Sequence, residues 1–379
     1  MKSLCNAVFC SAIAVACAVL TSCFKEEPLG SECDIMEASV HLSDPTAVFY
    51  NASDTSAFIT QDYASTDIVF NNVVKAADLA HMAPRFTITP GAVISPASGT
   101  ERDFSQGAQT YTVTSEDGNW SRTYTVRFAQ PQHFYQYDFD NYFLSDNGKY
   151  YVWSDMPAGE TPNWCSANAG YGVAKSKAAP EDYPTTPDEN GYEGACVKLT
   201  TVSTGSWGVM TNKRIAAGNL FLGSFDLSKA LTQTLQSTLF GVPTDKKPLC
   251  FTGYYKYQRG EKLQDKSGNE IEGEDNAAIY AVVYKNHDAD GNSVVLTGEN
   301  IMNSPLRVGM AKLYDIKNTT EWTYFDVAFD YWEDIDMNTL QNLGYNLAIL
   351  CSSSENGDLY QGALGSTLWI DKLSIGVEE

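Results

Sequence analysis

The sequence Trp-Thr-Tyr-Phe-Asp-Val-Ala-Phe-Asp-Tyr-Trp, residues 322–332, alternates between two kinds of side chain. Successive side chains of a β-strand point to opposite faces of a sheet, so this pattern predicts one long strand with two different faces. The odd face is apolar and we expect it to be buried; it consists of Phe325, Val327, Phe329 and Tyr331. The even face is polar enough to be solvated, and it consists of Trp322, Tyr324, Asp326, Asp330 and Trp332.

Other long strands are expected between Phe134 and residue 375, whereas only residues 227–235 show much helical spacing. Long strands joined by loops rich in Gly, Asp and Asn predict one antiparallel jelly-roll sandwich over residues 131–379, rather than an α/β enzyme. The additional strands expected are 196–202, 251–257, 279–284, 345–351 and 367–375.

Residues 33–130 contain shorter apolar runs separated by turn residues, which is typical of a small β-sandwich. Its clearest element is a hairpin of residues 110–114 and 121–128, both of which alternate strictly, with turn residues at 117–119. The pattern ends at residues 129–132, so we place the domain boundary between residues 130 and 131. The whole chain is therefore predicted to be all-β.

Residues 1–22 are typical of a signal peptide. Lys2 precedes an apolar run, residues 7–20, that is shorter than the roughly 20 residues a membrane-spanning helix needs. The run ends in Leu-Thr-Ser-Cys at residues 20–23, which resembles the bacterial lipobox, so we expect Cys23 to become a lipidated N-terminus. The alternatives are lipidation at Cys17, or a soluble secreted protein in which Cys23 has no such role.

Residues 23–32 are predicted to be a polar tether that follows the lipid. Within it, Lys-Glu-Glu at residues 25–27 resembles the signal that sends lipoproteins of one large group of Gram-negative bacteria to the outer face of the outer membrane. An ordinary charged tether is the alternative. We therefore expect an outer-membrane lipoprotein that is exposed at the cell surface.

The chain carries 47 acidic and 25 basic residues, which give a formal net charge of −22. Such a chain repels a phosphate backbone or an anionic lipid surface. We expect no nucleic-acid partner, and contact with a membrane only through the N-terminal lipid.

The cysteines beyond the lipid site are odd in number and form no CxxC pair, which argues against a disulfide scaffold or a zinc site. They are Cys33, Cys165, Cys196, Cys250 and Cys351.

Several segments resemble one family of lipoproteins, which carry the putative carbohydrate metabolism domain after an immunoglobulin-like domain. The similarity covers nearly the whole chain after Cys23 and is more specific in its C-terminal part. It implies an immunoglobulin-like sandwich at residues 33–130, a β jelly roll at residues 131–379 and a role in glycan use, but it supplies no catalytic residue. The segments that carry it include residues 27–29, 95–99, 111–117, 215–223, 253–257, 279–282 and 362–371.

Sugars present flat C–H faces and many hydroxyls, so their binding sites combine aromatic rings with polar donors and acceptors. The even face of residues 322–332 is the first candidate site, because two Trp beside two Asp form an apolar patch with a polar rim. The alternatives are packing between the sheets and contact with the N-terminal domain. A loop-rich stretch and a further strand supply the other candidates: Trp153, Trp164, Asn168, Tyr171, Tyr254 and Arg259.

Three acids suggest a structural calcium ion, the one cofactor expected. Asp138 and Asp140 lie near the start of the predicted jelly roll and Asp371 in its last strand. These ends pair in carbohydrate-binding jelly rolls, where similar acids hold calcium. Alternation places Asp371 on the face of Leu373 and Ile375, where a buried carboxylate needs a cation or hydrogen-bond donors. Hydrogen bonding to loop amides is the alternative.

A glycosidase needs two carboxylates at about 5–10 Å across the scissile bond. Glu193, Asp275 and Glu355 stand in loops beside the matched segments, but the sequence gives no reason to prefer any pair, so the catalytic residues are unknown.

The sequence predicts a surface-anchored lipoprotein whose jelly roll binds glycan in carbohydrate uptake or metabolism. A glycoside hydrolase on the same jelly roll and a structural subunit of a surface or adhesin assembly are the alternatives, so enzymatic activity is left open. The expected partners are a glycan and glycan-uptake or surface-assembly proteins.

The lipid anchor can be tested by replacing the acceptor thiol. Cys23→Ala should release the protein from the membrane fraction, because the lipid is attached through the Cys23 thiol. Fractionation combined with mass spectrometry of the N-terminal peptide measures this. Unchanged fractionation, together with the absence of an acyl chain on the wild-type peptide, would refute the anchor.

Overall fold

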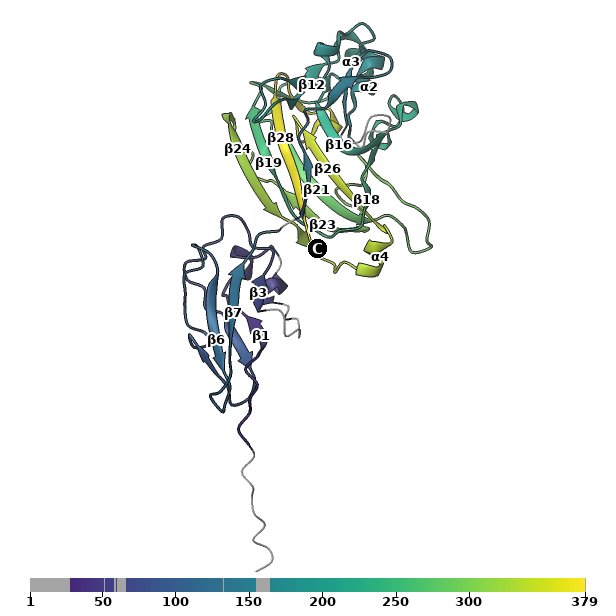
Figure 1. Ribbon diagram of the computed structural model, residues 1–379. Helices are drawn as coiled ribbons and strands as arrows, with labels where there is room; N and C mark the ends of the chain where they lie inside the picture. Colours follow the sequence, from purple (N-terminus) through teal and green to yellow (C-terminus); the bar gives the residue numbers. More distant parts are fainter. Residues whose placement is uncertain are drawn as a thin grey trace, which may run out of the picture. The chain divides into compact units, whose positions relative to one another are not determined.

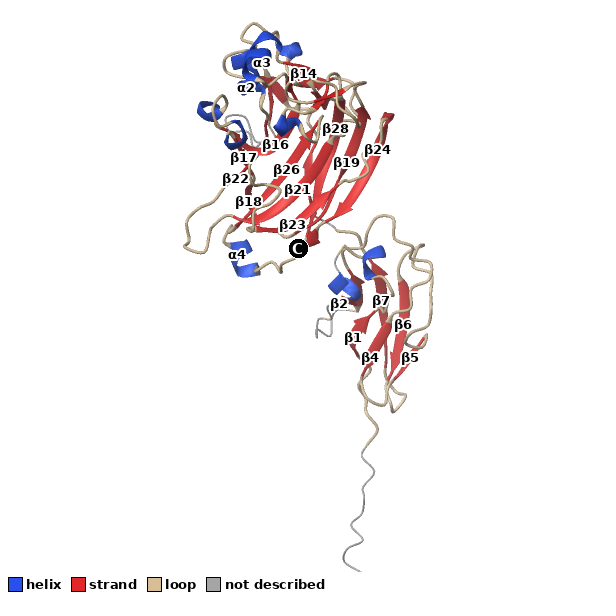
Figure 2. Cartoon of the chain, turned by 180° about the vertical axis from the view of Figure 1, so that it is seen from behind, coloured by secondary structure: helices blue, strands red, loops and turns tan. Residues whose placement is uncertain are grey.

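The computed structural model describes residues 28–50, 52–57, 59, 66–131, 133–154 and 164–378. Residues 1–27 lie outside the described residues, and with them the lipobox, Cys17, Cys23 and the Lys-Glu-Glu run. The chain forms two compact units, the first from residues up to 41 with 56–69 and 79–127, and the second from 42–55, 70–78 and 128 onward. Both consist of antiparallel strands (Figure 1 and Figure 2), which confirms the all-β prediction. None of the described helices is long and apolar enough to cross a membrane.

The first unit contains a three-stranded and a four-stranded sheet. The predicted hairpin is present, with Tyr111 paired to Tyr124. Both side chains are buried, as their alternation predicts. The ring of Phe86, from the other sheet, packs edge-on against Tyr111 at 4.7 Å, so aromatic side chains join the two layers. In sheet order the strands are β2 (Ser56–Ala57), β1 (Ile35–Ser39) and β4 (Arg85–Ile88), then β3 (Asp67–Phe70), β7 (Ser121–Phe128), β6 (Gln109–Thr114) and β5 (Val93–Ser95).

The second unit is a two-layered jelly-roll sandwich. The six-stranded sheet contains β12 (Thr185–Asp188), β13 (Cys196–Thr200), β28 (Thr367–Val377), β19 (Pro248–Gln258) and β24 (Thr319–Ala328), with β8 (His133–Tyr137) also paired to β28. The nine-stranded sheet contains β22 (Leu296–Thr297), β17 (Thr238–Phe240), β16 (Asn219–Phe225), β26 (Tyr345–Ser352), β21 (Ala278–Lys285), β23 (Arg307–Lys312) and β25 (Asp330–Tyr331), with β11 (Trp164–Cys165) on β16 and β18 (Val242–Thr244) on β26.

Short helices and small strand pairs complete the second unit. The segment with helical spacing, residues 227–235, forms two 3₁₀ turns, η4 (Leu227–Lys229) and η5 (Thr234–Gln236). In Figure 1, α2 and α3 lie together at one end of the sheets and α4 lies at the other. The remaining elements are α2 (Asn168–Ala174), α3 (Gly205–Thr211), α4 (Met337–Gln341), η1 (Pro45–Ala47), η2 (Ala52–Thr55), η3 (Pro180–Asp182), η6 (Gly357–Leu359), β9 (Tyr142–Leu144), β10 (Tyr151–Trp153), β14 (Val202–Ser203), β15 (Ile215–Ala216), β20 (Leu263–Gln264) and β27 (Gly362–Ala363).

The main core lies between the two sheets. Alternate residues of β21 and β26, such as Ile279 and Ile349, meet alternate residues of β19 and β28, such as Tyr255 and Ile370. All four side chains are at most 2% exposed. Burial of this apolar surface stabilises the sandwich and fixes the register of its long strands.

A bulge in β28 reverses the predicted alternation of that strand. Lys372 has a left-handed backbone conformation, with φ at 48°, and the pairing with β19 shifts at the same point. Leu373 therefore points into the main core, on the opposite side of the sheet from Trp369. Gly253 makes room for it, because a Cβ atom there would lie 2.6 Å from Leu373 Cδ2. The prediction that Asp371 shares a face with Leu373 and Ile375 was wrong for this reason.

The stretch of residues 322–332 forms two strands in two different sheets. Its odd face is buried as predicted, since Phe325 and Phe329 are each 4% exposed and belong to the main core. However, β24 pairs with β19 in the six-stranded sheet, whereas β25 pairs with β23 in the nine-stranded sheet. The chain crosses from one layer to the other near Phe329, so the even positions do not share one surface.

Replacement of Trp164 tests its place in the core. The side chain is 3% exposed and packs edge-on against Tyr137 and Phe139, at 5.0 and 5.2 Å between ring centres. Trp164→Ala should cost about 3–5 kcal/mol of unfolding free energy, because it leaves a cavity. Thermal unfolding monitored by near-UV circular dichroism measures this. Trp120→Ala, at a Trp that is 63% exposed, is the control and should unfold like the wild type; equal melting temperatures for both variants would contradict the core position.

Candidate functional site

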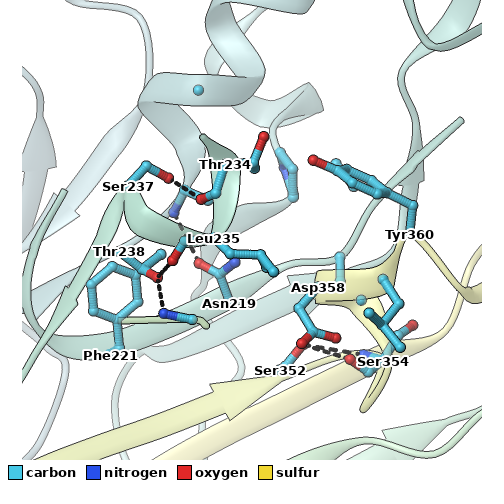
Figure 3. Close-up of a pocket in the computed structure, with 18 of the residues that line it drawn as sticks. Asn219, Phe221, Thr234, Leu235, Ser237, Thr238, Ser352, Ser354, Asp358 and Tyr360 are labelled. Carbon is cyan, nitrogen blue, oxygen red and sulfur yellow. Dashed lines mark hydrogen bonds between the residues drawn. The ribbon is translucent and has the colours of Figure 1, made fainter. Parts of the chain in front are cut away.

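A pocket of about 410 Å³ lies on the outer face of the nine-stranded sheet (Figure 3). Strands β16, β21 and β26 supply its floor, for example through Phe221, Tyr280 and Ser352. Residues of α2, α3 and the 3₁₀ turn η5, together with Ala230 and Leu231 after η4, cover it, and residues 354–360 line a further wall. The pocket therefore combines segments that are far apart in the sequence.

The floor exists because the central strands are apolar on both faces. Leu220 and Ile279 point into the main core, whereas the next residue in each strand, Phe221 and Tyr280, belongs to a second buried cluster on the outer face. This second cluster includes Phe240. The aromatic residues Phe221, Phe240 and Tyr280 of this cluster also line the pocket.

The wall at residues 354–360 carries two carboxylates. Glu355 forms an ion pair with Lys312 at 2.7 Å, and both residues line the pocket together with Asp358. The Asp358 residue is still exposed, and partial burial of its carboxyl raises the pKa of that group above its usual value. Burial raises the pKa of the Tyr280 hydroxyl, and the charges of Asp358 and, more weakly, Glu355 raise it further. Both carboxylates and Tyr280 line the same pocket.

Tyr360 and Lys213 form another part of the pocket lining. Tyr360 has a left-handed backbone conformation, with φ at 58°, which is uncommon for a side chain of this size and is found more often at functional sites. Its hydroxyl is buried and has no hydrogen-bond partner among the described residues. The Lys213 ammonium donates to Thr234 Oγ1 at 2.7 Å and lies 5.3 Å from the centre of the Tyr360 ring.

A buried aspartate holds this wall in place. Asp275 is 4% exposed, and one of its carboxylate oxygens accepts hydrogen bonds from the Ser354 and Ser366 hydroxyls at 2.6 and 2.7 Å and from the Ala363 amide at 2.7 Å. Burial raises the pKa of this carboxyl, although the hydrogen bonds oppose the rise. Arg259, a predicted glycan-binding residue, donates to the Asp275 carbonyl at 2.6 Å and pairs with Glu274. Its guanidinium therefore anchors the adjacent loop.

The candidates from the loop-rich stretch are mostly structural. Trp153 and Trp164 are 2% and 3% exposed and lie in the main core, so the packing alternative describes them. Asn168 and Tyr171 do line the pocket. Asn168 is fully buried, however, and its amide is hydrogen-bonded to the backbone of Thr185, which places it in the supporting structure of α2.

The even face of residues 322–332 is divided between the two layers. Trp322 and Tyr324 stay on the outer face of the six-stranded sheet, where the Tyr324 ring lies 5.2 Å from that of Tyr254. Asp326 lies on the same strand, and both of its carboxylate oxygens are 2.8 Å from the Tyr50 hydroxyl, which donates to the carboxylate. Asp326 is therefore engaged within the second unit and is not available as a free sugar acceptor.

Trp332 and Asp330 lie away from that face. Trp332 is 52% exposed, and its indole nitrogen donates to the Arg307 carbonyl at 2.9 Å, beside β23 of the nine-stranded sheet. Asp330 is exposed on the short strand β25, which also pairs with β23. Neither residue lines the pocket.

The acids proposed for calcium have other partners. One Asp371 oxygen accepts from the amides of Tyr192 and Glu193, and the other accepts from the Lys372 amide. Asp140 accepts from the Ala195 amide at 2.8 Å, and the Lys372 ammonium lies 3.3 Å from Asp138. Among the described residues no group of three or more His, Cys, Asp or Glu side chains is arranged to hold a metal ion. These hydrogen bonds are those of the alternative interpretation, and the calcium site stays a prediction.

Sequence reasoning missed most of the pocket. Trp207, Lys213, Asp358 and Tyr360 have no motif that marks them, because they meet only after the sheet has formed. Glu355 was noted as a loop acid beside a matched segment, and its position after Ser352-Ser353-Ser354 was the one signal in the sequence.

Comparison with known proteins identifies the class and then the family. Residues 138–376 match the putative carbohydrate metabolism domain, and residues 51–127 match the N-terminal domain of SGBP. The jelly-roll fold and these matches give the protein a glycan-related role. The chain belongs to the putative carbohydrate metabolism domain family. No curated protein matches it.

Two solved structures are similar over most of their length. A putative glycoside hydrolase from Bacteroides thetaiotaomicron is 37% identical, with a TM-score of 0.60, and the match covers 94% of this chain and 99% of that one. A putative glycoside hydrolase from Bacteroides vulgatus is 36% identical, with a TM-score of 0.59, and the match covers 64% of this chain and 98% of that one.

Proposed function

We propose that the protein binds glycan in the pocket on the nine-stranded sheet. The observation that carries this proposal is the lining of the pocket, in which aromatic rings such as Trp207 and Tyr360 accompany the hydroxyls of Ser352 and Thr234 and the carboxylate of Asp358. Aromatic rings pack against sugar C–H faces, and the polar groups satisfy sugar hydroxyls. The family and the related structures support the same class of ligand.

The anchor belongs to the same proposal. A lipid on Cys23 and the Lys-Glu-Glu signal at residues 25–27 would place the glycan-binding unit at the cell surface. The net charge of −22 gives the protein little attraction of its own for an anionic membrane, which supports the need for a covalent tether.

Removal of the half-buried Trp207 tests the pocket. A glycan array of neutral oligosaccharides identifies a ligand, and isothermal titration calorimetry then compares variants. Trp207→Ala should weaken binding by about thirtyfold, as expected for an aromatic hot spot, with little change in melting temperature.

Trp332→Ala is the matched control, because this Trp is exposed and lies outside the pocket. Its affinity should equal that of the wild type. If Trp332→Ala or Trp322→Ala loses affinity whereas Trp207→Ala does not, the binding site lies on the strands of residues 322–332 and the pocket proposal is wrong.

Glycoside hydrolysis is the second candidate, and a specific observation favours it. Asp358 and Glu355 line one pocket, and the raised pKa of Asp358 suits a general acid. The acid must be protonated, so hydrolysis should fall as the pH rises through the raised pKa of Asp358. Asp358→Asn should abolish formation of the hydrolysis product and retain glycan binding. Product analysis by mass spectrometry across pH measures this; no product from the wild type at any pH leaves the protein as a binder.

A further inference from the structure

A row of alternating Lys and Trp side chains crosses the outer face of the six-stranded sheet. Lys198 on β13 is paired with Trp369 on β28, and Trp369 is paired with Lys256 on β19. The Lys256 ammonium lies 5.3 Å from the centre of the Trp369 ring and 4.5 Å from that of Trp322 on β24. The Lys198 ammonium lies 5.9 Å from the Trp369 ring. The row therefore spans four neighbouring strands.

These side chains face away from the main core. Their neighbours along the strands, such as Leu199, Ile370 and Tyr257, are fully buried between the two sheets. The four residues of the row are each partly exposed. The surface continues at Tyr192, which is 47% exposed, stacks on Tyr254 at 3.6 Å and meets Trp322 edge-on.

The charge of the row is unusual for this chain. Acidic residues outnumber basic ones by 47 to 25, yet neither Lys198 nor Lys256 forms an ion pair with a described residue. The nearby carboxylate of Asp188 accepts a hydrogen bond from the Trp369 indole at 3.0 Å. The aromatic rings hold the ammonium groups in position, and the N–H donors of Lys256 stay available for an anion.

The spacing suits a chain of sugars. Neighbouring strands lie about 4.8 Å apart, so Trp322 and Trp369, which flank β19, are separated by roughly 10 Å. Two consecutive sugar units span a comparable length, and Lys256 lies between the two rings. An acidic group on such a ligand would meet the ammonium while its sugar rings lie against the indoles.

We propose that this row is a second glycan-binding surface, separate from the pocket, and that it takes oligosaccharides that carry carboxylate or sulfate groups. Lys256 and Lys198 bind the anionic group, and Trp369 and Trp322 contact the sugar rings. Opposite charge favours the anionic ligand here, since an ammonium binds a carboxylate or sulfate more strongly than it binds the hydroxyl of a neutral sugar.

Calorimetric titration of the full chain with three oligosaccharides tests the proposal. An oligogalacturonide carries carboxylates, its methyl ester is the uncharged match, and a sulfated galacto-oligosaccharide supplies the other anion. We expect at least one of the two anionic ligands to bind about tenfold or more tightly than the methyl ester, and the stronger of the two identifies the anion. If neither anionic ligand binds better than the ester, the proposal is overturned.

Variants locate the site. Lys256→Gln should lower the affinity for the anionic ligand by about tenfold, whereas Lys266→Gln, the same charge change at an exposed Lys elsewhere on the unit, should not. Melting temperatures check that both variants are folded. Trp207→Ala should leave this affinity unchanged, so the result is independent of the pocket. An equal effect of the two Lys variants, or loss of anionic binding in Trp207→Ala, would overturn the assignment.

Discussion

Burial of both faces of the central strands is the constraint from which the rest of the second unit follows. Strands β16, β21 and β26 carry apolar side chains on the outer face as well as the inner one. An apolar outer face must be covered to be stable in water, and α2, α3, the 3₁₀ turn η5 and the residues just after η4 supply part of that cover. Where the cover is incomplete, the pocket remains. The site is thus a gap in the second apolar layer.

The pocket wall depends in turn on one buried carboxylate. Asp275 takes three hydrogen bonds on one oxygen, from Ser354, Ala363 and Ser366. These donors lie on both sides of the segment that carries Glu355, Asp358 and Tyr360 in sequence. A buried carboxylate is costly unless it is well hydrogen-bonded, so this arrangement ties the two ends of the segment to one point. The strained conformation of Tyr360 is held within that frame.

The sequence predicted local features of this structure better than long-range ones. Alternation placed Phe325 and Phe329 in the core correctly, because the pleat of a strand is a local property. It could not show that the chain changes sheets near Phe329, or that Lys372 forms a bulge, because both depend on partners far away in sequence. For the same reason it could not decide whether Trp153 and Trp164 contact glycan or pack between the sheets, and the structure shows that they pack. The pocket was not predicted, since its walls come from separate segments.

The two outer faces of the jelly roll differ in chemistry because they are built differently. The nine-stranded sheet has an apolar outer face, so loops cover it and the polar groups of the site, such as Glu355 and Asp358, come from those loops. The six-stranded sheet has an outer face on which Trp and Lys alternate, and it needs no such cover, because half-exposed indoles and ammonium groups stabilise each other. One face therefore encloses a pocket, and the other presents an open row of side chains. A single core thus supports two outer surfaces of different chemistry.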